Sequence, residues 1–186
     1  MGGIKKHLPN LLTLTNIALG LCAVLVLVQT NHPHKVTIAA FFVVFGGICD
    51  FFDGFLARKL GVASVMGKQL DSFADLVTFG VAPVALLNYA CTCGMPWLTV
   101  SLSLLYVSAG AYRLARFNLA DFSKHFIGLQ IPAAGIALAI YGALLPHWAG
   151  FVSNATSAAV TSVFIVVLVI LMVSKKKINR IGRIGN

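Results

Sequence analysis

Long apolar segments, separated by short stretches rich in charged residues, Pro or Gly, make up most of this sequence. The first runs from Leu11 to Gln29 without a charged residue. The second runs from Val36 to Ala57, and only Asp50 and Asp53 interrupt it, near its end. A helix needs about 20 mainly apolar residues to cross the ~30 Å hydrocarbon layer of a membrane. Both segments are therefore predicted to be transmembrane helices.

Two later uncharged segments are each too long for a single span. The segment from Leu76 to Tyr112 contains Pro and Gly at residues 93–96, and the segment from Phe126 to Ser174 contains them at 146–150. Such residues favour the turn of a helical hairpin. The pattern predicts an all-α integral membrane protein with six transmembrane helices in one membrane-embedded domain, residues 1–186. The approximate spans are 11–29, 36–57, 72–93, 96–115, 128–146 and 154–174.

Composition supports a membrane location. The chain is 59% hydrophobic and 10% charged, with a mean hydropathy of +0.91, which is far from an average water-soluble domain. The basic residues and apolar run near the start are interpreted as a retained helix and not as a cleaved signal peptide, because no convincing small-residue cleavage site follows. The four cysteines lack the paired spacing of a zinc site and are interpreted as unpaired apolar residues.

The distribution of basic residues predicts the orientation. An even number of spans puts both termini on one side, and all but one of the 14 Lys and Arg fall on that side. Only Lys35 falls on the other. By the positive-inside rule, the basic side is cytoplasmic. We expect a protein of the cell (inner) membrane with its site and both termini in the cytoplasm, in contact with membrane lipids, and no nucleic-acid partner.

Four of the five acidic residues lie between positions 50 and 75, at the cytoplasmic ends of the second and third spans. A carboxylate at the centre of a membrane helix costs ~2.5 to 3.5 kcal/mol on insertion scales, so such residues usually have a function. At 100° per residue, each group of acids shares a helix face with small residues. One face carries Asp50, Asp53, Gly54 and Ala57, and the other carries Gly67, Asp71 and Asp75.

Because the two helices are consecutive and antiparallel, we expect their acidic faces to meet. Ligands that are all carboxylate oxygens suit Mg²⁺, Mn²⁺ or Ca²⁺ better than zinc. Two such ions could hold a pyrophosphate and stabilise a leaving oxygen. Two alternatives remain. The site could belong to a divalent-cation transporter, or the acids could form structural salt bridges with Arg58, Lys59, Lys68, Arg113 or Arg116.

Residues 50–58, DFFDGFLAR, are followed after eight residues by residues 67–75, GKQLDSFAD. This pattern resembles the DxxDGxxAR…GxxxDxxxD motif of the CDP-alcohol phosphatidyltransferases, with every fixed position present. The resemblance extends over most of the chain. It implies a six-helix membrane enzyme that usually forms homodimers.

The resemblance also implies roles for individual residues. The four aspartates of the motif would bind two divalent ions, Mg²⁺ or Mn²⁺, and Asp75 would also accept the proton of the alcohol. Residues 9–13, PNLLT, are similar to a further segment of the family that faces the nucleotide, although Asn and Thr near a helix start are often caps. The implied metal ligands are Asp50, Asp53, Asp71 and Asp75. The implied CDP-binding residues are Asn10, Thr13, Asp53, Gly54, Ala57, Arg58 and Gly67.

Three segments resemble the branch of the family that uses serine: residues 71–83, residues 113–118, and residues 125–134, in which Gln130 replaces an expected Pro. The implied reaction transfers the phosphatidyl group from CDP-diacylglycerol to L-serine and yields phosphatidylserine and CMP. Arg113 or Arg116 could bind the serine carboxylate, or could extend to phospholipid headgroups instead. Glycerol 3-phosphate, inositol phosphate and choline are alternative acceptors. Direct displacement and a covalent intermediate on a carboxylate both remain open.

Overall fold

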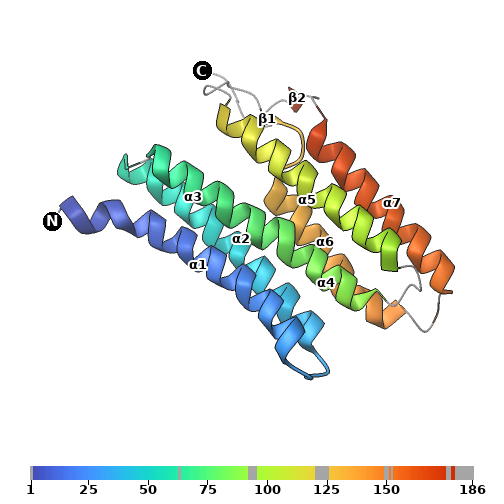
Figure 1. Ribbon diagram of the computed structural model, residues 1–186. Helices are drawn as coiled ribbons and strands as arrows, with labels where there is room; N and C mark the ends of the chain where they lie inside the picture. Colours follow the sequence, from blue (N-terminus) through green and yellow to red (C-terminus); the bar gives the residue numbers. More distant parts are fainter. Residues whose placement is uncertain are drawn as a thin grey trace, which may run out of the picture.

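The structure, a computed structural model, is a bundle of long helices (Figure 1). It describes residues 2–62, 64–91, 96–119, 126–148, 151, 153–174 and 177–178. The α-helices are α1 (Gly2–Gln29), α2 (Lys35–Leu60), α3 (Val65–Asp75), α4 (Ala82–Ala90), α5 (Pro96–Leu119), α6 (Ile131–Trp148) and α7 (Asn154–Val173).

Six helices in the described part of the chain are long and apolar enough to cross a membrane. One of them, Val65–Ala90, consists of α3, the π-helical turn η1 (Leu76–Val81) and α4. The prediction of a helical multi-pass membrane protein with six spans is confirmed. The strands that are described, β1 (Phe126–Ile127) and β2 (Lys177–Ile178), are two residues each and pair antiparallel between the segments that follow α5 and α7.

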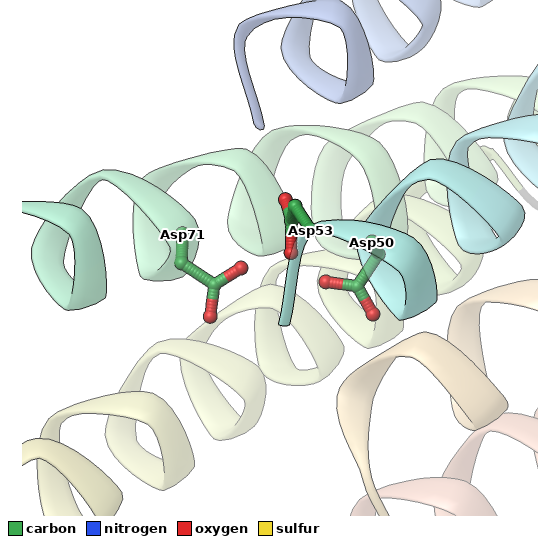
Figure 2. Close-up of side chains that lie close together, drawn as sticks. All are labelled: Asp50, Asp53 and Asp71. Atoms are coloured by element: carbon green, nitrogen blue, oxygen red, sulfur yellow. The ribbon is translucent and has the colours of Figure 1, made fainter. Parts of the chain in front are cut away.

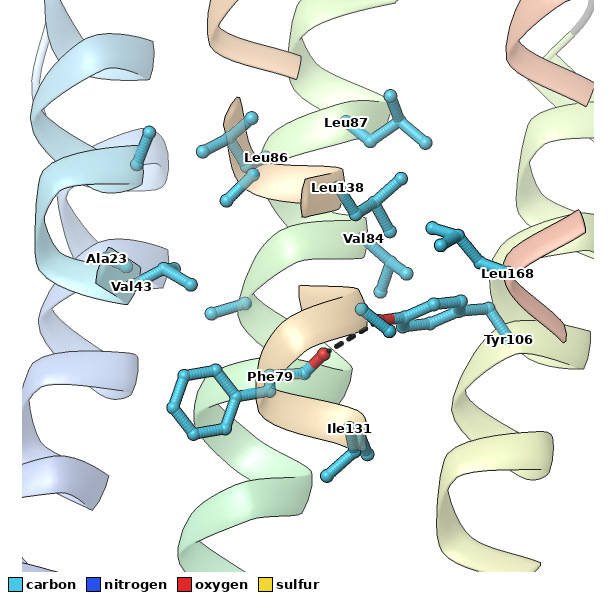
Figure 3. Close-up of a cluster of buried hydrophobic side chains, with 14 of the residues drawn as sticks. Ala23, Val43, Phe79, Val84, Leu86, Leu87, Tyr106, Ile131, Leu138 and Leu168 are labelled. Carbon is cyan, nitrogen blue, oxygen red and sulfur yellow. Dashed lines mark hydrogen bonds between the residues drawn. The ribbon is translucent and has the colours of Figure 1, made fainter. Parts of the chain in front are cut away.

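The start of α1, the α2–α3 connection and the end of α7 lie toward the same end of the bundle, as an even number of spans requires (Figure 1). Helix α1 packs most extensively on α2, α4 on α6, and α5 on α7. Figure 3 shows the apolar core, to which several helices contribute; its members include Val43 from α2, Leu86 from α4 and Leu138 from α6. The packing places the α2–α3 connection beside the start of α1.

Two local signals define the sharp reversal between α2 and α3. Gly61 ends α2 in the left-handed conformation, at φ 63°, which glycine adopts at little cost. Ser64 caps α3, because its hydroxyl oxygen accepts a 3.0 Å hydrogen bond from the backbone N–H of Gly67. Helix α3 therefore begins at Val65, before the expected start of the span at residue 72. As a result, Gly67, Asp71 and Asp75 share one helix.

The π-helical turn η1 follows Asp75 directly. Pro83 has no N–H to donate to the carbonyl of Phe79, four residues earlier. That carbonyl instead accepts a 3.1 Å hydrogen bond from the hydroxyl of Tyr106 on α5, a fully buried side chain (Figure 3). The backbone group that Pro83 leaves without its helical partner is thus satisfied by a neighbouring helix, as a membrane interior requires.

The cysteine interpretation is partly corrected by the structure. Cys22 and Cys49 are free, in agreement with it. Cys91, the residue that follows α4, is disulfide-bonded, so the expectation of an unpaired apolar residue is wrong for this position.

Candidate active site

The carboxylates of Asp50 and Asp53 on α2 lie close to that of Asp71 on α3 (Figure 2). One carboxylate oxygen from each of the three lies within 4.8 Å of the others. Asp53 is buried, and Asp50 and Asp71 are half-buried. The predicted convergence of the two acidic faces is present in the structure.

Asp75 lies one helical turn beyond Asp71 and is only 7% exposed. It does not belong to the group of three oxygens within 4.8 Å. Its carboxyl group nevertheless interacts with that of Asp50. One oxygen of Asp71 and one of Asp75, each Oδ1, are buried without a hydrogen-bond partner. The fourth acid therefore extends the cluster toward the interior of the bundle.

Helix α1 contributes a hydroxyl to the cluster. Thr13 Oγ1 lies 2.8 Å from Asp53 Oδ2 and 3.1 Å from the carbonyl oxygen of Pro9, so its single O–H is shared between these two acceptors. Because α1 begins at Gly2, Asn10 and Thr13 lie inside the helix and do not cap it. Thr13 orients one carboxylate of the cluster from outside the DxxDG motif.

The other residues expected to bind CDP gather at the same end of the bundle. A Cβ atom added at Gly54 would lie 3.4 Å from Arg58 Nη1, and one added at Gly67 would lie 3.4 Å from Asn10 Oδ1. The absence of a side chain at each glycine therefore lets a polar side chain lie close to the helix backbone. Arg58 is exposed and interacts electrostatically with Asp53 and Asp71. Half-buried Ala57 lies one turn after Asp53 on α2.

No ion pair joins the four aspartates to lysine or arginine within the described ranges, so Arg58 and Arg113 interact with them only at longer range. Lys68 instead donates to the carbonyls of Phe117 and Asn118, at 3.2 and 3.3 Å. Four carboxylates that close together repel one another without a cation between them. Every potential metal ligand in the cluster is a carboxylate oxygen, and two of these oxygens have no hydrogen-bond partner. The cluster therefore fits a hard divalent cation.

The two arginines of α5 have different surroundings. Arg116 donates a 3.3 Å hydrogen bond to the carbonyl of Val173 at the end of α7. Arg113 is only 8% exposed, its Nε has no hydrogen-bond partner, and its charge interacts with Asp75. Arg113, and not Arg116, is therefore the buried arginine that interacts electrostatically with the acidic cluster and keeps an unpartnered donor.

Sequence reasoning missed several polar residues near the cluster. Asn118 Nδ2 donates to Ser72 Oγ at 2.9 Å, which links the two serine-branch segments on α5 and α3. Thr78 Oγ1 donates to the backbone carbonyl of Asn16 at 2.8 Å. The available signal was spacing, since Asn16 follows Thr13 by three residues and Thr78 follows Asp75 by three.

Comparison with known proteins places this geometry in a family. Residues 6–174 match the sequence profile of the CDP-alcohol phosphatidyltransferases. The CDP-diacylglycerol–serine O-phosphatidyltransferase of Bacillus subtilis is 42% identical over 137 residues, which cover 73% of this chain and 75% of that protein. The enzyme of the same name from Helicobacter pylori is 35% identical over 160 residues, 84% of this chain and 65% of that protein. The archaetidylserine synthase of Methanothermobacter thermautotrophicus is 31% identical over 156 residues, 82% of this chain and 63% of that protein. The chain thus spans just under two thirds of the last two relatives, and it belongs to the CDP-alcohol phosphatidyltransferase family.

Proposed function

We propose that this protein transfers the phosphatidyl group from CDP-diacylglycerol to L-serine and releases CMP. The observation that carries the proposal is the meeting of the motif carboxylates from α2 and α3, with one oxygen each from Asp50, Asp53 and Asp71 within 4.8 Å. Serine as the acceptor is supported by the names of the relatives and by the resemblance of residues 71–83 and 113–118 to the serine-using branch.

The proposed cofactor is Mg²⁺ or Mn²⁺, two ions held by Asp50, Asp53, Asp71 and Asp75. The support is an all-oxygen donor set with unpartnered oxygens on Asp71 and Asp75. Bound divalent ions would neutralise the pyrophosphate and stabilise the leaving oxygen. Thr13 fixes one oxygen of Asp53, so this ligand is held in place before substrate arrives.

In the proposed reaction, the serine hydroxyl oxygen attacks the phosphorus that carries the diacylglycerol. A bond forms between that oxygen and phosphorus, and the bond from phosphorus to the CMP oxygen breaks. Asp75 accepts the hydroxyl proton, and CMP leaves with the bonding electron pair. The products are phosphatidylserine and CMP, and no covalent enzyme intermediate is needed.

The nucleotide side of the site is assigned to α1, α2 and the first turn of α3. Arg58 is exposed and carries a planar guanidinium that can donate two parallel hydrogen bonds to a phosphate. Gly54 and Gly67 carry no Cβ atom, so Arg58 at the first position and Ser64 and Asn10 at the second lie close to the helix backbone, and Asn10 and Thr13 lie on the α1 side.

For the acceptor side we propose Arg113 as the group that binds the serine carboxylate. Its guanidinium is buried, has an unpartnered Nε and interacts with Asp75. A carboxylate is the natural partner of such a group, because charge-assisted hydrogen bonds are roughly twice as strong as neutral ones. Binding there would bring the serine hydroxyl toward the proposed base.

The expected result for the purified protein with CDP-diacylglycerol and Mn²⁺ or Mg²⁺ is CMP release that depends on serine. The measurement compares serine with glycerol 3-phosphate, inositol phosphate and choline at equal concentrations. Asp50→Asn is the negative control, because it removes a charge from the cluster and leaves the outer half of the bundle unchanged. Faster CMP release with another alcohol would contradict the choice of serine.

The proposed orientation places the acidic cluster and both termini in the cytoplasm, with the chain in the cell membrane, on the support of the segregated Lys and Arg residues. A cysteine introduced near Arg58 should resist an impermeant reagent in intact cells, whereas one near Gln29 or Asn31 should react. The experiment uses an active variant without the native cysteines, and the opposite labelling pattern would reverse the orientation.

A homodimer is also proposed, and the family resemblance supports it.

A further inference from the structure

A second polar layer lies beneath the acidic cluster, and its centre is Asn16. This side chain is fully buried on α1, and neither Nδ2 nor Oδ1 has a hydrogen-bond partner. A buried polar group without a hydrogen-bond partner destabilises the folded state. Such a residue does not stabilise the bundle by itself, so its presence among apolar neighbours needs another reason.

Three helices enclose the Asn16 amide. A Cβ atom added at Gly46 on α2 would lie 2.8 Å from Asn16 Oδ1 and 2.6 Å from Thr78 Cγ2. The Thr78 hydroxyl on η1 donates to the backbone carbonyl of Asn16 at 2.8 Å. The absence of a side chain at Gly46 therefore leaves the space that the amide occupies. The hydrogen bond from Thr78 fixes the position of α1 along its axis relative to η1.

The register along each helix places this layer next to the acids. Gly46 precedes Asp50 by four residues on α2, and Thr78 follows Asp75 by three on the third span. On α1, Asn16 follows by three residues the threonine that binds Asp53. Asn16 thus lies about one helical turn, ~5.4 Å, deeper in the bundle than the cluster.

The unpartnered atoms of the two layers are chemically complementary. Asn16 Nδ2 is a buried donor, and Asp75 Oδ1 is a buried acceptor. Two hydrogen bonds of ~2.8 Å in series, through one water molecule, span about the rise of one helical turn. Buried waters typically occupy such places, where several polar groups lack partners.

We propose that Asn16 is a positioning residue for the acidic site. Its amide donates to a water molecule enclosed between α1, α2 and η1, and that water donates to Oδ1 of Asp75. The contact fixes the carboxylate so that its other oxygen faces the reacting groups. This role rests on the proposed function of the cluster, in which Asp75 is both a ligand and the base.

The test uses the full-length protein with Asn16→Ala or Asn16→Ser, which differ by one hydroxyl group. Mn²⁺ affinity is measured without substrates by electron paramagnetic resonance, beside kcat, KM and the melting temperature. Outer-shell partners of metal ligands typically change affinity or activity by 10–100-fold, so Asn16→Ala should weaken Mn²⁺ binding and lower kcat by at least ~10-fold. Its melting temperature should change little, because the amide has no direct protein partner to lose. Asn16→Ser keeps a donor beside the water and should recover most of both losses.

Asn88→Ala is the matched control. Asn88 Nδ2 donates to Ser103 Oγ at 2.7 Å and to the Val84 carbonyl at 2.8 Å, in the outer half of the bundle. This variant should melt at a lower temperature and bind Mn²⁺ as the wild type does. The inference is overturned if Asn16→Ala keeps wild-type Mn²⁺ affinity, whether or not its melting temperature falls. A wild-type protein that bound no Mn²⁺ and released no CMP would overturn the proposed function as well.

Discussion

Replacing Asp75 by Asn should reduce turnover by a factor of ~10² to 10⁴, the usual contribution of general-base catalysis. The substitution keeps the size of the side chain and one oxygen ligand but removes the charge and most of the basicity. The protein should still fold, insert and bind CDP-diacylglycerol, because Asp75 makes no structural salt bridge with any described residue. The measurement is CMP release at saturating serine, together with binding of CDP-diacylglycerol.

Asp121→Asn is the control for this prediction, since Asp121 is the acid outside the motif. It lies outside the described residues, and the variant should stay close to wild type. If Asp75→Asn keeps more than about a tenth of wild-type turnover, the proton leaves by another route and Asp75 is not the base.

Replacing Arg113 by Ala should raise the KM for serine by ~10- to 100-fold, because a hydrogen bond to a charged group contributes about 1.5–3 kcal/mol. The KM for CDP-diacylglycerol should change much less. Arg113→Lys keeps the charge but loses the planar donor pair, so its effect should be intermediate.

Serine methyl ester, which lacks the free carboxylate, provides a second readout. The wild type should strongly prefer serine to this ester, and Arg113→Ala should lose most of that preference.

Arg116→Ala is the matched control, because Arg116 is three residues away on the same helix and donates to the Val173 carbonyl of α7. It should affect stability and leave the KM for serine near the wild-type value. The assignment fails if both arginine variants raise this KM equally, or if Arg113→Ala raises the KM of both substrates alike.

Much of the site could be predicted from spacing, because regular helices give fixed offsets. Asp50 and Asp53 on one helix and Asp71 on the next are close in the structure, as the offsets and the antiparallel order require. The helix count follows from length and hydropathy. These features depend on local geometry and on the thickness of the membrane, both of which are readable from a single sequence.

Other features depend on which side chains meet across helices. Thr13 and Asp53 are 40 positions apart, and their hydrogen bond follows from the tight packing of α1 on α2. Arg113 and Arg116 look equivalent in sequence, yet Arg113 is buried and interacts electrostatically with Asp75, whereas Arg116 donates to the end of α7. Asn16 could not be distinguished from an ordinary polar residue until its neighbours were known to leave its amide unpaired.

The hydrogen bond from the Tyr106 hydroxyl to the Phe79 carbonyl fixes how far α5 is shifted along the helix formed by α3, η1 and α4. Asp75 precedes Phe79 by four residues on one helix, and Arg113 follows Tyr106 by seven on the other, so each pair lies on one helix face. Sliding α5 along α3 would therefore separate the proposed base from the arginine proposed to hold the acceptor. The number of residues between Asp75 and Pro83 also affects the position of Asp75 relative to Arg113. That stretch contains the π-helical turn η1, which sets how the acids are rotated relative to α4. The distance between the proposed base and the proposed acceptor-binding arginine is thus set deep in the bundle, away from the atoms of the proposed reaction.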